Sequence, residues 1–412
     1  LYTLAKLATI VKMKRDAEAR GLRAVAFFWL ATEDHDYDEA ATLAIPSKLV
    51  PNAPAGGDLV TLKAQRRSQE RLAIGRVEIP QEAARELDAM LGLESPGWLR
   101  EGITFGDSFA ELIASVFGDE VVLIDALLPE LRRAGGPLLA SIAARNGEAQ
   151  EALATRAAEL RDAGYREQVT ARGDDYTLLF ELGDDGIRRP LDRGAEVPPE
   201  SISTSALTRP LLQDVVLQPD VFVGGPAEVA YYAQVGALHE LFGVAQPRVA
   251  LRGHALVAPY RLLRSAEKYG LPLDGVFRPA EELIAPSESG AVREVEAAIA
   301  QAKRDLMTAV GRVSELALPA EHALAARIQR SVGHLEYHLG KLEERSVRAL
   351  LRRDRERFDI ARKLVATLYP DGHVQDRVVS WLALWGRYGS ELVDRLIEEI
   401  EPDTGVYLIV PI

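Results

Sequence analysis

The sequence predicts an α/β protein in which a doubly wound parallel sheet is followed by an α-helical antiparallel coiled-coil domain. Residues 25–31 and 121–124 are unbroken apolar runs of strand length, the pattern of parallel strands that helices cover on both faces. Helical periodicity separates the two runs, as in a doubly wound sheet. Over residues 292–313 and 324–342 apolar side chains recur at spacings of mostly three or four positions, which predicts two long helices joined through residues 318–320.

These patterns also set the expected domain limits. We expect a core with connecting segments over residues 1–285, a coiled-coil hairpin over 286–360, and helices over 361–412 that pack back on the core. The chain has 412 residues, more than a single core usually organises. More than one structural module is therefore expected.

The first helix is predicted over residues 1–20, because the apolar residues Leu4, Leu7, Ile10 and Val11 share one side of a helical wheel. Gly21 follows as a C-cap. The first residue is leucine rather than methionine, and the sequence begins inside this helix. We therefore expect the sequence to be a fragment of a longer chain that lacks its N-terminus.

Polar and ionisable side chains follow the first predicted strand without a break: Thr32, Glu33, Asp34, His35 and Asp36. In an open α/β sheet, ligands bind in the crevice beyond the carboxyl ends of the strands. This stretch is accordingly the first candidate for the chemistry of the protein.

A second candidate is the turn Gly224-Gly225-Pro226, which follows the apolar residues 221–223 and precedes a predicted helix containing Glu228. A glycine turn before a helix presents backbone N–H groups and the positive end of the helix dipole, a ready site for a carboxylate or phosphate. The spacing is neither that of a dinucleotide fingerprint nor that of a P-loop. A simple tight turn between strand and helix explains it equally well.

Composition excludes several classes of protein. The formal net charge of −13 argues against general affinity for nucleic acids or anionic membranes. No apolar run reaches the roughly 20 residues that span a bilayer. The absence of cysteine excludes a disulfide framework, a thiol nucleophile and a thiolate-ligated metal, and is compatible with a cytoplasmic protein.

Three motifs together resemble one family, the cysteine-adding enzyme of bacillithiol biosynthesis, BshC. Residues 28–37 read Phe-Trp-Leu-Ala-Thr-Glu-Asp-His-Asp-Tyr, residues 224–232 read Gly-Gly-Pro-Ala-Glu-Val-Ala-Tyr-Tyr, and residues 369–377 begin Tyr-Pro-Asp-Gly and end Gln-Asp-Arg. Tyr388 and Gly389 follow the third motif. The motifs occur in the family's order on either side of the predicted hairpin, so the resemblance covers essentially the whole sequence.

The resemblance implies a Rossmann-like nucleotidyltransferase-type core and a C-terminal coiled-coil domain through which two copies form a homodimer. It implies the last step of bacillithiol synthesis, in which the amine of glucosaminyl malate attacks the carboxyl carbon of L-cysteine and an amide forms. Because amide formation from a carboxylate is uphill in water, ATP or another adenine nucleotide is the expected co-substrate. No metal is expected.

The resemblance also implies roles for individual residues. We expect His35 or Asp36 to act as general base on the amine, and Glu33 or Asp34 to hold the substrate ammonium or the sugar hydroxyls. Arg209 and Gln213 match an Arg-Pro-x-x-Gln-Asp motif. The remaining expected substrate contacts are Tyr2, Lys6, Gly224, Gly225 and Glu228.

Arg209 is expected to clamp a malate or cysteine carboxylate, although an internal ion pair is the alternative. The segment before Arg209 departs from the family pattern, because Thr204 and Ser205 stand where the resemblance predicts proline and asparagine, and Thr208 stands where an apolar residue is usual.

Other classes of function stay open at this point. The carboxylates and His35 could form a metal site. The protein could be a non-catalytic scaffold that binds a metabolite and dimerises through the coiled coil. It could also be an adenylating, synthetase-like enzyme with another acceptor such as RNA, which the acidic charge opposes. The intact cluster of residues 33–36 is the feature against a scaffold.

Overall fold

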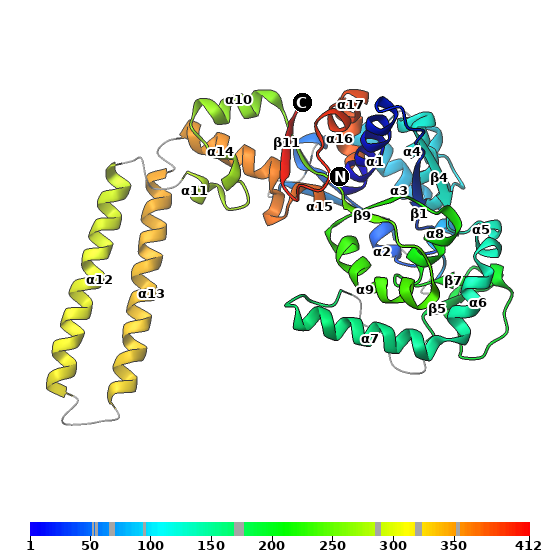
Figure 1. Cartoon of the computed structure of the whole chain (residues 1–412). Helices are drawn as coiled ribbons and strands as arrows, with labels where there is room; N and C mark the ends of the chain where they lie inside the picture. The colour runs from blue at the N-terminus through cyan, green and yellow to red at the C-terminus, as the bar shows by residue number, and fades with distance from the viewer. Residues whose placement is uncertain are drawn as a thin grey trace. The chain divides into compact units, whose positions relative to one another are not determined.

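The computed structural model describes residues 1–51, 53, 57–65, 71–93, 96–168, 177–284, 290–317, 324–351 and 355–412 (Figure 1). Internal contacts group them into two compact units. The first comprises residues 1–257, 376–410 and 412, and the second comprises residues 258–375 and 411. The limits expected from the sequence, at residues 285 and 360, differ from this grouping and stay predictions.

Two pairs of parallel strands form the centre of the first unit. Strand β1 (Ala26–Leu30) pairs with β4 (Val121–Asp125), in the register that places Leu30 opposite Asp125. Strand β8 (Val221–Gly224) pairs with β9 (Arg248–Leu251). Both apolar runs therefore form the predicted parallel strands, and the α/β class is confirmed. The expected burial is only partial, because Phe27 and Val122 are 40% and 44% exposed.

Apart from Asp125, the last residue of β4, the β1–β4 pair is apolar because it separates two hydrophobic cores. Phe28 and Leu123 pack against one core, whereas Trp29 and Ile124 pack against the other. Successive side chains of a strand point to opposite faces. A strand covered on both faces therefore needs apolar residues at consecutive positions.

Helix α1 (Tyr2–Ala19) buries Leu4, Leu7 and Val11, as the spacing predicts. It contacts both β1 and β8, together with the closing helices α16 (Trp381–Tyr388) and α17 (Ser390–Glu399). The N-terminal helix and the two closing helices lie side by side in Figure 1. The chain turns away after α1 at Gly21, whose φ is 82°, a conformation that glycine adopts without strain.

The remaining strands of the first unit are short. They are β2 (Thr42–Pro46) paired with β3 (Leu59–Lys63), β5 (Leu179–Leu182) between β6 (Arg188–Pro190) and β7 (Ile202–Thr204), and β10 (His254–Ala258) paired with β11 (Tyr407–Pro411). The other α-helices are α2 (Tyr37–Ala40), α3 (Gln81–Leu91), α4 (Phe105–Phe117), α5 (Pro129–Ala134), α6 (Gly136–Ala144), α7 (Asn146–Asp162), α8 (Arg209–Leu217), α9 (Pro226–Phe242) and α15 (Gln375–Val378).

The second unit is helical. Its helices are α10 (Tyr260–Lys268), α11 (Ala280–Leu283), α12 (Gly290–Ala317), α13 (Leu324–Leu351) and α14 (Arg355–Leu368). Helices α12 and α13 lie side by side, as Figure 1 shows, and Lys303 Nζ on α12 lies 3.0 Å from Glu343 Oε2 on α13. The two predicted long helices are confirmed. Their predicted connection through residues 318–320 lies outside the described residues.

Within the described ranges, none of the helices has the length and apolar character that crossing a bilayer requires.

Candidate active site

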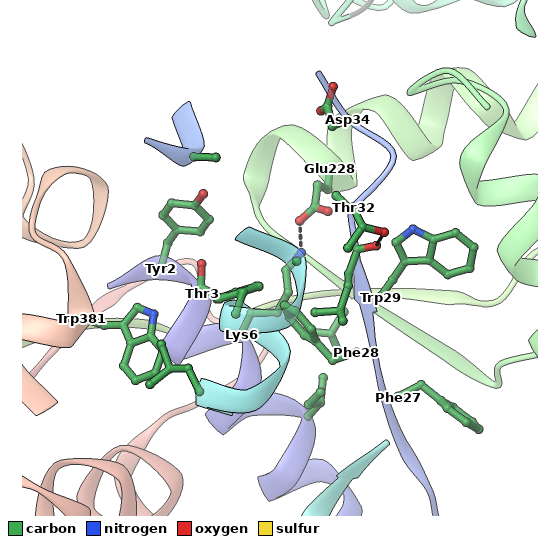
Figure 2. Close-up of a pocket in the computed structure, with 18 of the residues that line it drawn as sticks. Tyr2, Thr3, Lys6, Phe27, Phe28, Trp29, Thr32, Asp34, Glu228 and Trp381 are labelled. Atoms are coloured by element: carbon green, nitrogen blue, oxygen red, sulfur yellow. Dashed lines mark hydrogen bonds and ion pairs between the residues drawn. The ribbon is translucent and has the colours of Figure 1, made fainter. Parts of the chain in front are cut away.

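A cavity of about 1570 Å³ lies in the first unit, and its lining includes β1 and the segments before and after it. Seven of the residues expected at the site line it: Tyr2, Lys6, Asp34, Asp36, Arg209, Gln213 and Glu228. Figure 2 shows the Lys6 and Glu228 side chains pointing toward each other, with Thr32 and Asp34 on the segment that follows β1. The cavity therefore gathers side chains from α1, from the end of β1, and from α8 and α9.

Lys6 and Glu228 form an ion pair that connects α1 to the first turn of α9. The same carboxylate oxygen accepts the backbone N–H of Gly225 at 2.8 Å. Burial opposes ionisation of Glu228, but Lys6 and then Arg209 outweigh burial and hold its pKa below the ordinary value. Burial also lowers the pKa of Lys6, an effect that Glu228 opposes.

The contact between Glu228 and the Gly225 N–H argues against the carboxylate or phosphate site expected at the glycine turn. Gly224 and Gly225 do not line the cavity, and the Gly225 N–H already donates to an internal carboxylate. The anion expected at the start of this helix is thus supplied by the protein itself. A substrate phosphate or carboxylate would have to displace Glu228 to bind at this helix end.

Arg209, at the start of α8, donates hydrogen bonds to two neutral side chains of the cavity wall. One of its terminal nitrogens lies 3.2 Å from Gln213 Oε1, and the other donates to the hydroxyl of Tyr231. Neither partner carries a negative charge, so neither contact is the internal ion pair that the sequence analysis gave as the alternative for Arg209. A guanidinium with neutral partners keeps its positive charge available to an incoming anion.

Glu33 is a buried structural carboxylate. It is 5% exposed and accepts hydrogen bonds at 2.7 Å from both Ser203 and Thr204, with Arg132 3.8 Å away. The hydroxyl of Thr204, at a position where the resemblance predicts proline, therefore makes a specific contact. Glu33 does not line the cavity, so this geometry disfavours the expected contact between Glu33 and the substrate.

His35 does not line the cavity. Its Nδ1 lies 3.1 Å from a guanidinium nitrogen of Arg188. Because arginine only donates, Nδ1 must accept, which leaves the proton of the neutral ring on Nε2. Burial and then Arg188 lower the pKa of His35. A ring whose basic nitrogen already accepts a hydrogen bond is poorly placed to act as general base.

Asp34 and Asp36 remain as the carboxylates of the cluster that line the cavity. The side chain of Asp34 is 53% exposed, and its Oδ1 accepts the backbone N–H of His35 at 2.7 Å. Asp36 is also exposed, and it caps α2 by accepting the N–H of Glu39 at 3.1 Å. Each carboxylate has remaining capacity to accept a proton or bind an ammonium group.

Three further residues shape the site, of which the sequence analysis gave no role to Thr32 and did not single out Tyr231 or Arg188. Tyr231 belongs to the second motif and contacts Arg209, so that motif already contained it. Thr32 donates to Asp125 at the end of the neighbouring strand, which holds the polar cluster against β4. Arg188 had no signal in the sequence, because its contacts with His35 and Ser203 join distant segments.

Within the described part of the chain, His, Asp and Glu residues nowhere form a group of three or more that could hold a metal ion. In the cluster at residues 33–36, Asp34 and Asp36 line the cavity, whereas Glu33 and His35 do not.

The parallel strands, the cavity beside β1 and the long helical hairpin define a Rossmann-like α/β protein with an appended helical domain. Residues 1–197 and 187–253 match the model of the N-terminal Rossmann-like domain of BshC, of bacillithiol biosynthesis, and residues 255–412 match the model of its C-terminal coiled-coil domain. The chain therefore belongs to the BshC family.

Curated relatives agree with this assignment. A protein of Solibacter usitatus (strain Ellin6076) is 29% identical over 435 residues, covering 97% of this chain and 79% of the relative. A protein of Geobacillus kaustophilus (strain HTA426) is 26% identical over 454 residues, covering 100% and 81%. Both carry the name "Putative cysteine ligase BshC".

Proposed function

We propose that this protein is a ligase that joins the carboxyl group of L-cysteine to the amine of glucosaminyl malate, the last step of bacillithiol synthesis. The observation that carries the proposal is the match of both BshC domains along the chain, together with the names of the relatives. The cavity supports it, because cations and carboxylates that suit zwitterionic and dicarboxylate substrates line the same space.

We use the geometry to choose among the roles expected from the sequence. We assign the general base to Asp36 rather than His35, because Asp36 lines the cavity and the basic nitrogen of His35 is occupied. We assign the contact with the ammonium or sugar hydroxyls to Asp34 rather than to the buried Glu33. Arg209 then takes a substrate carboxylate, with Lys6 and Tyr2 on the facing helix.

In the proposed reaction, the glucosamine nitrogen attacks the carboxyl carbon of cysteine and forms the C–N bond. Asp36 accepts the proton that the amine loses. The C–O bond to the activating group breaks, and that group leaves with the electron pair. Because a free carboxylate is a poor electrophile, we infer that ATP or another adenine nucleotide supplies the activating group.

The positively charged side chains of the cavity are suited to binding the phosphates of a nucleotide. Lys6, Arg209 and Arg377 line it, a charge set that can accommodate polyphosphate as well as dicarboxylate groups. The beginning of α9 does not fit a phosphate, because Glu228 takes the N–H of Gly225. We therefore place the nucleotide phosphates near the cationic side chains rather than at the glycine turn.

We further propose that the hairpin of α12 and α13 pairs two copies of the chain. Apolar side chains on both helices are exposed in the single chain: Met307, Val313, Leu316, Leu335, Tyr337 and Leu342. Light scattering should give twice the chain mass of 45.1 kDa, and Leu335→Lys with Leu342→Lys should give the monomer mass. A monomeric parent protein would refute the pairing.

A turnover assay tests the proposed activity. The protein is incubated with cysteine, glucosaminyl malate and ATP, and each component is left out in turn. Mass spectrometry should detect bacillithiol only when all three are present. If the protein binds glucosaminyl malate but forms no product, the non-catalytic scaffold considered from the sequence is favoured instead. We also propose that the protein is cytoplasmic, which fractionation of cells that express the tagged protein would test.

A further inference from the structure

A buried pair of ionisable side chains lies behind Arg209, outside the cavity. Asp214 on α8 and His239 on α9 have side chains that are 0% and 2% exposed, and Asp214 Oδ2 lies 2.8 Å from His239 Nε2. The other oxygen of Asp214 accepts a hydrogen bond from Gln213 Nε2 at 3.2 Å. Gln213 Oε1 in turn accepts from Arg209 at 3.2 Å. A continuous chain of hydrogen bonds therefore runs from His239 to the cavity wall.

The direction of each hydrogen bond in this chain is fixed. Arg209 only donates, so it must meet the oxygen of the Gln213 amide. The nitrogen of that amide must then face Asp214, which accepts. If the Gln213 amide were reversed, its NH₂ group would face the guanidinium and its oxygen would face a carboxylate. Asp214 therefore determines which end of Gln213 is presented to Arg209.

His239 fixes Asp214 in the same way. His239 Nδ1 lies 3.2 Å from the carbonyl oxygen of Val235, which can only accept, so Nδ1 carries a proton. The contact between Nε2 and Asp214 then requires a second proton, on the ring or on the carboxyl group. Both nitrogens of the ring are thus committed, and His239 has one orientation.

We propose that Asp214 and His239 are positioning residues for Arg209, so that through Gln213 they hold its guanidinium ready for a carboxylate of the substrate. This inference rests on the proposed function for the identity of that carboxylate. Its support is the unbroken path of contacts and the placement of Arg209, Gln213 and Tyr231 on the cavity wall.

Simple stabilisation of the helix pair explains the arrangement less well. A buried ion pair often stabilises a fold no more than well-packed apolar side chains do. Helices α8 and α9 already share an apolar core that includes Leu211, Leu212, Val235 and Leu238. The polar chain instead gives one orientation to a side chain that lines the cavity, which apolar contacts cannot do.

Isosteric variants test the proposal. The amide introduced by Asp214→Asn can accept from Gln213 and donate to a neutral His239, whereas Asp214→Leu removes both contacts. Likewise, His239→Gln can still donate to Asp214 and His239→Leu cannot. Leu153→Ala on α7, a buried core position, is the control for a general loss of stability.

The readout is the dissociation constant of L-malate, a dicarboxylate probe, measured by calorimetry on the full chain. We expect Asp214→Leu and His239→Leu to weaken binding about tenfold or more, and Asp214→Asn, His239→Gln and Leu153→Ala to stay within about threefold. In an Arg209→Met background, Asp214→Leu should weaken binding no further. A merely structural role would give the same loss with and without Arg209.

Three results would overturn the proposal: no binding of malate by the parent, unchanged binding in both leucine variants, or additive losses with Arg209→Met. If a leucine variant does not fold, an alanine variant replaces it. The malate affinity of Asp214→Ala is then compared with that of Asp214→Asn, and the affinity of His239→Ala with that of His239→Gln. If the variants rank as expected in malate affinity but the protein forms no bacillithiol, the positioning role stands and the proposed function is refuted.

Discussion

The ammonium of Lys6 on α1 and the carboxylate of Glu228 on α9 form an ion pair across 222 positions of sequence. The same carboxylate caps the beginning of α9 through the N–H of Gly225. One side chain thus joins the first helix of the unit, the glycine turn after β8 and the cavity. The ion pair is only partly buried, with side-chain exposures of 20% for Lys6 and 28% for Glu228.

Glu228→Gln should lower the free energy of unfolding by about 1–3 kcal/mol at neutral pH, because it removes a charge-assisted hydrogen bond and leaves Lys6 without its counter-charge. The pKa of Glu228 in the folded protein lies below its ordinary value of 4.5. The stabilisation that ionised Glu228 provides is therefore complete at pH values above 4.5, and it disappears as the pH falls through the lowered pKa. Urea unfolding at several pH values measures the difference.

The parent protein and Glu228→Gln should consequently converge in stability at acidic pH. A difference that stays constant from neutral to strongly acidic pH would show that Glu228 acts through packing rather than charge. Arg133→Gln offers a control, since Arg133 pairs with Glu130 on the exposed surface and such pairs contribute little.

Replacing Asp36 should impair catalysis far more than replacing His35. Asp36→Asn keeps the cap of α2, because asparagine is also a good N-cap, but it removes the proposed base and should lower kcat about a hundredfold or more. His35→Asn keeps an acceptor for Arg188 and should stay within about tenfold of the parent. Single-turnover rates of bacillithiol formation measure both. The reverse order would return the role of base to His35.

The two glycines of the turn should respond differently to alanine. A Cβ at Gly224 would lie 2.8 Å from a ring carbon of Phe222 and 3.0 Å from Glu228 Cβ, so Gly224→Ala should cost about 1–3 kcal/mol through overpacking. A Cβ at Gly225 would approach nothing closer than 3.6 Å. Gly225→Ala is therefore the matched control, and thermal unfolding compares them. Equal losses would contradict the packing described for this turn.

Glu33 should matter for stability rather than for substrate binding. Glu33→Ala leaves the hydroxyls of Ser203 and Thr204 without their acceptor and Arg132 without a counter-charge, which should cost about 2–4 kcal/mol. The neighbouring Asp34→Ala should cost less than about 1 kcal/mol, because Asp34 is exposed. Denaturant unfolding tests this order, and a stable Glu33→Ala that no longer binds glucosaminyl malate would contradict it.

Local sequence patterns predicted the elements that place the site. The apolar run before Thr32 gave β1, and the helical spacing of Leu4, Leu7 and Val11 gave α1, because each pattern repeats with the period of its element. The same reasoning singled out the segment after β1, of which Asp34 and Asp36 line the cavity. It missed β2, β3 and β11, which are as long as β1 but lack a strict alternation of apolar and polar residues.

Sequence patterns could not predict which members of the polar cluster face the cavity. The outcome depends on partners far along the chain, since Glu33 is held by Ser203 and Thr204, and His35 by Arg188, at separations of 153 to 171 positions. No local period reports such contacts. For the same reason, the sequence alone gave no ground for preferring Asp34 and Asp36 over Glu33 and His35 as residues that contact the substrate.

The most direct measurement follows the oxygen atoms of cysteine. The protein is given ATP, glucosaminyl malate and cysteine whose carboxyl oxygens are both ¹⁸O, and the products are analysed by mass spectrometry. Carboxyl activation by nucleotide predicts bacillithiol that keeps one ¹⁸O in its amide, with the other ¹⁸O in the AMP or phosphate released. Absence of bacillithiol, or bacillithiol with no ¹⁸O in the nucleotide products, would contradict this account.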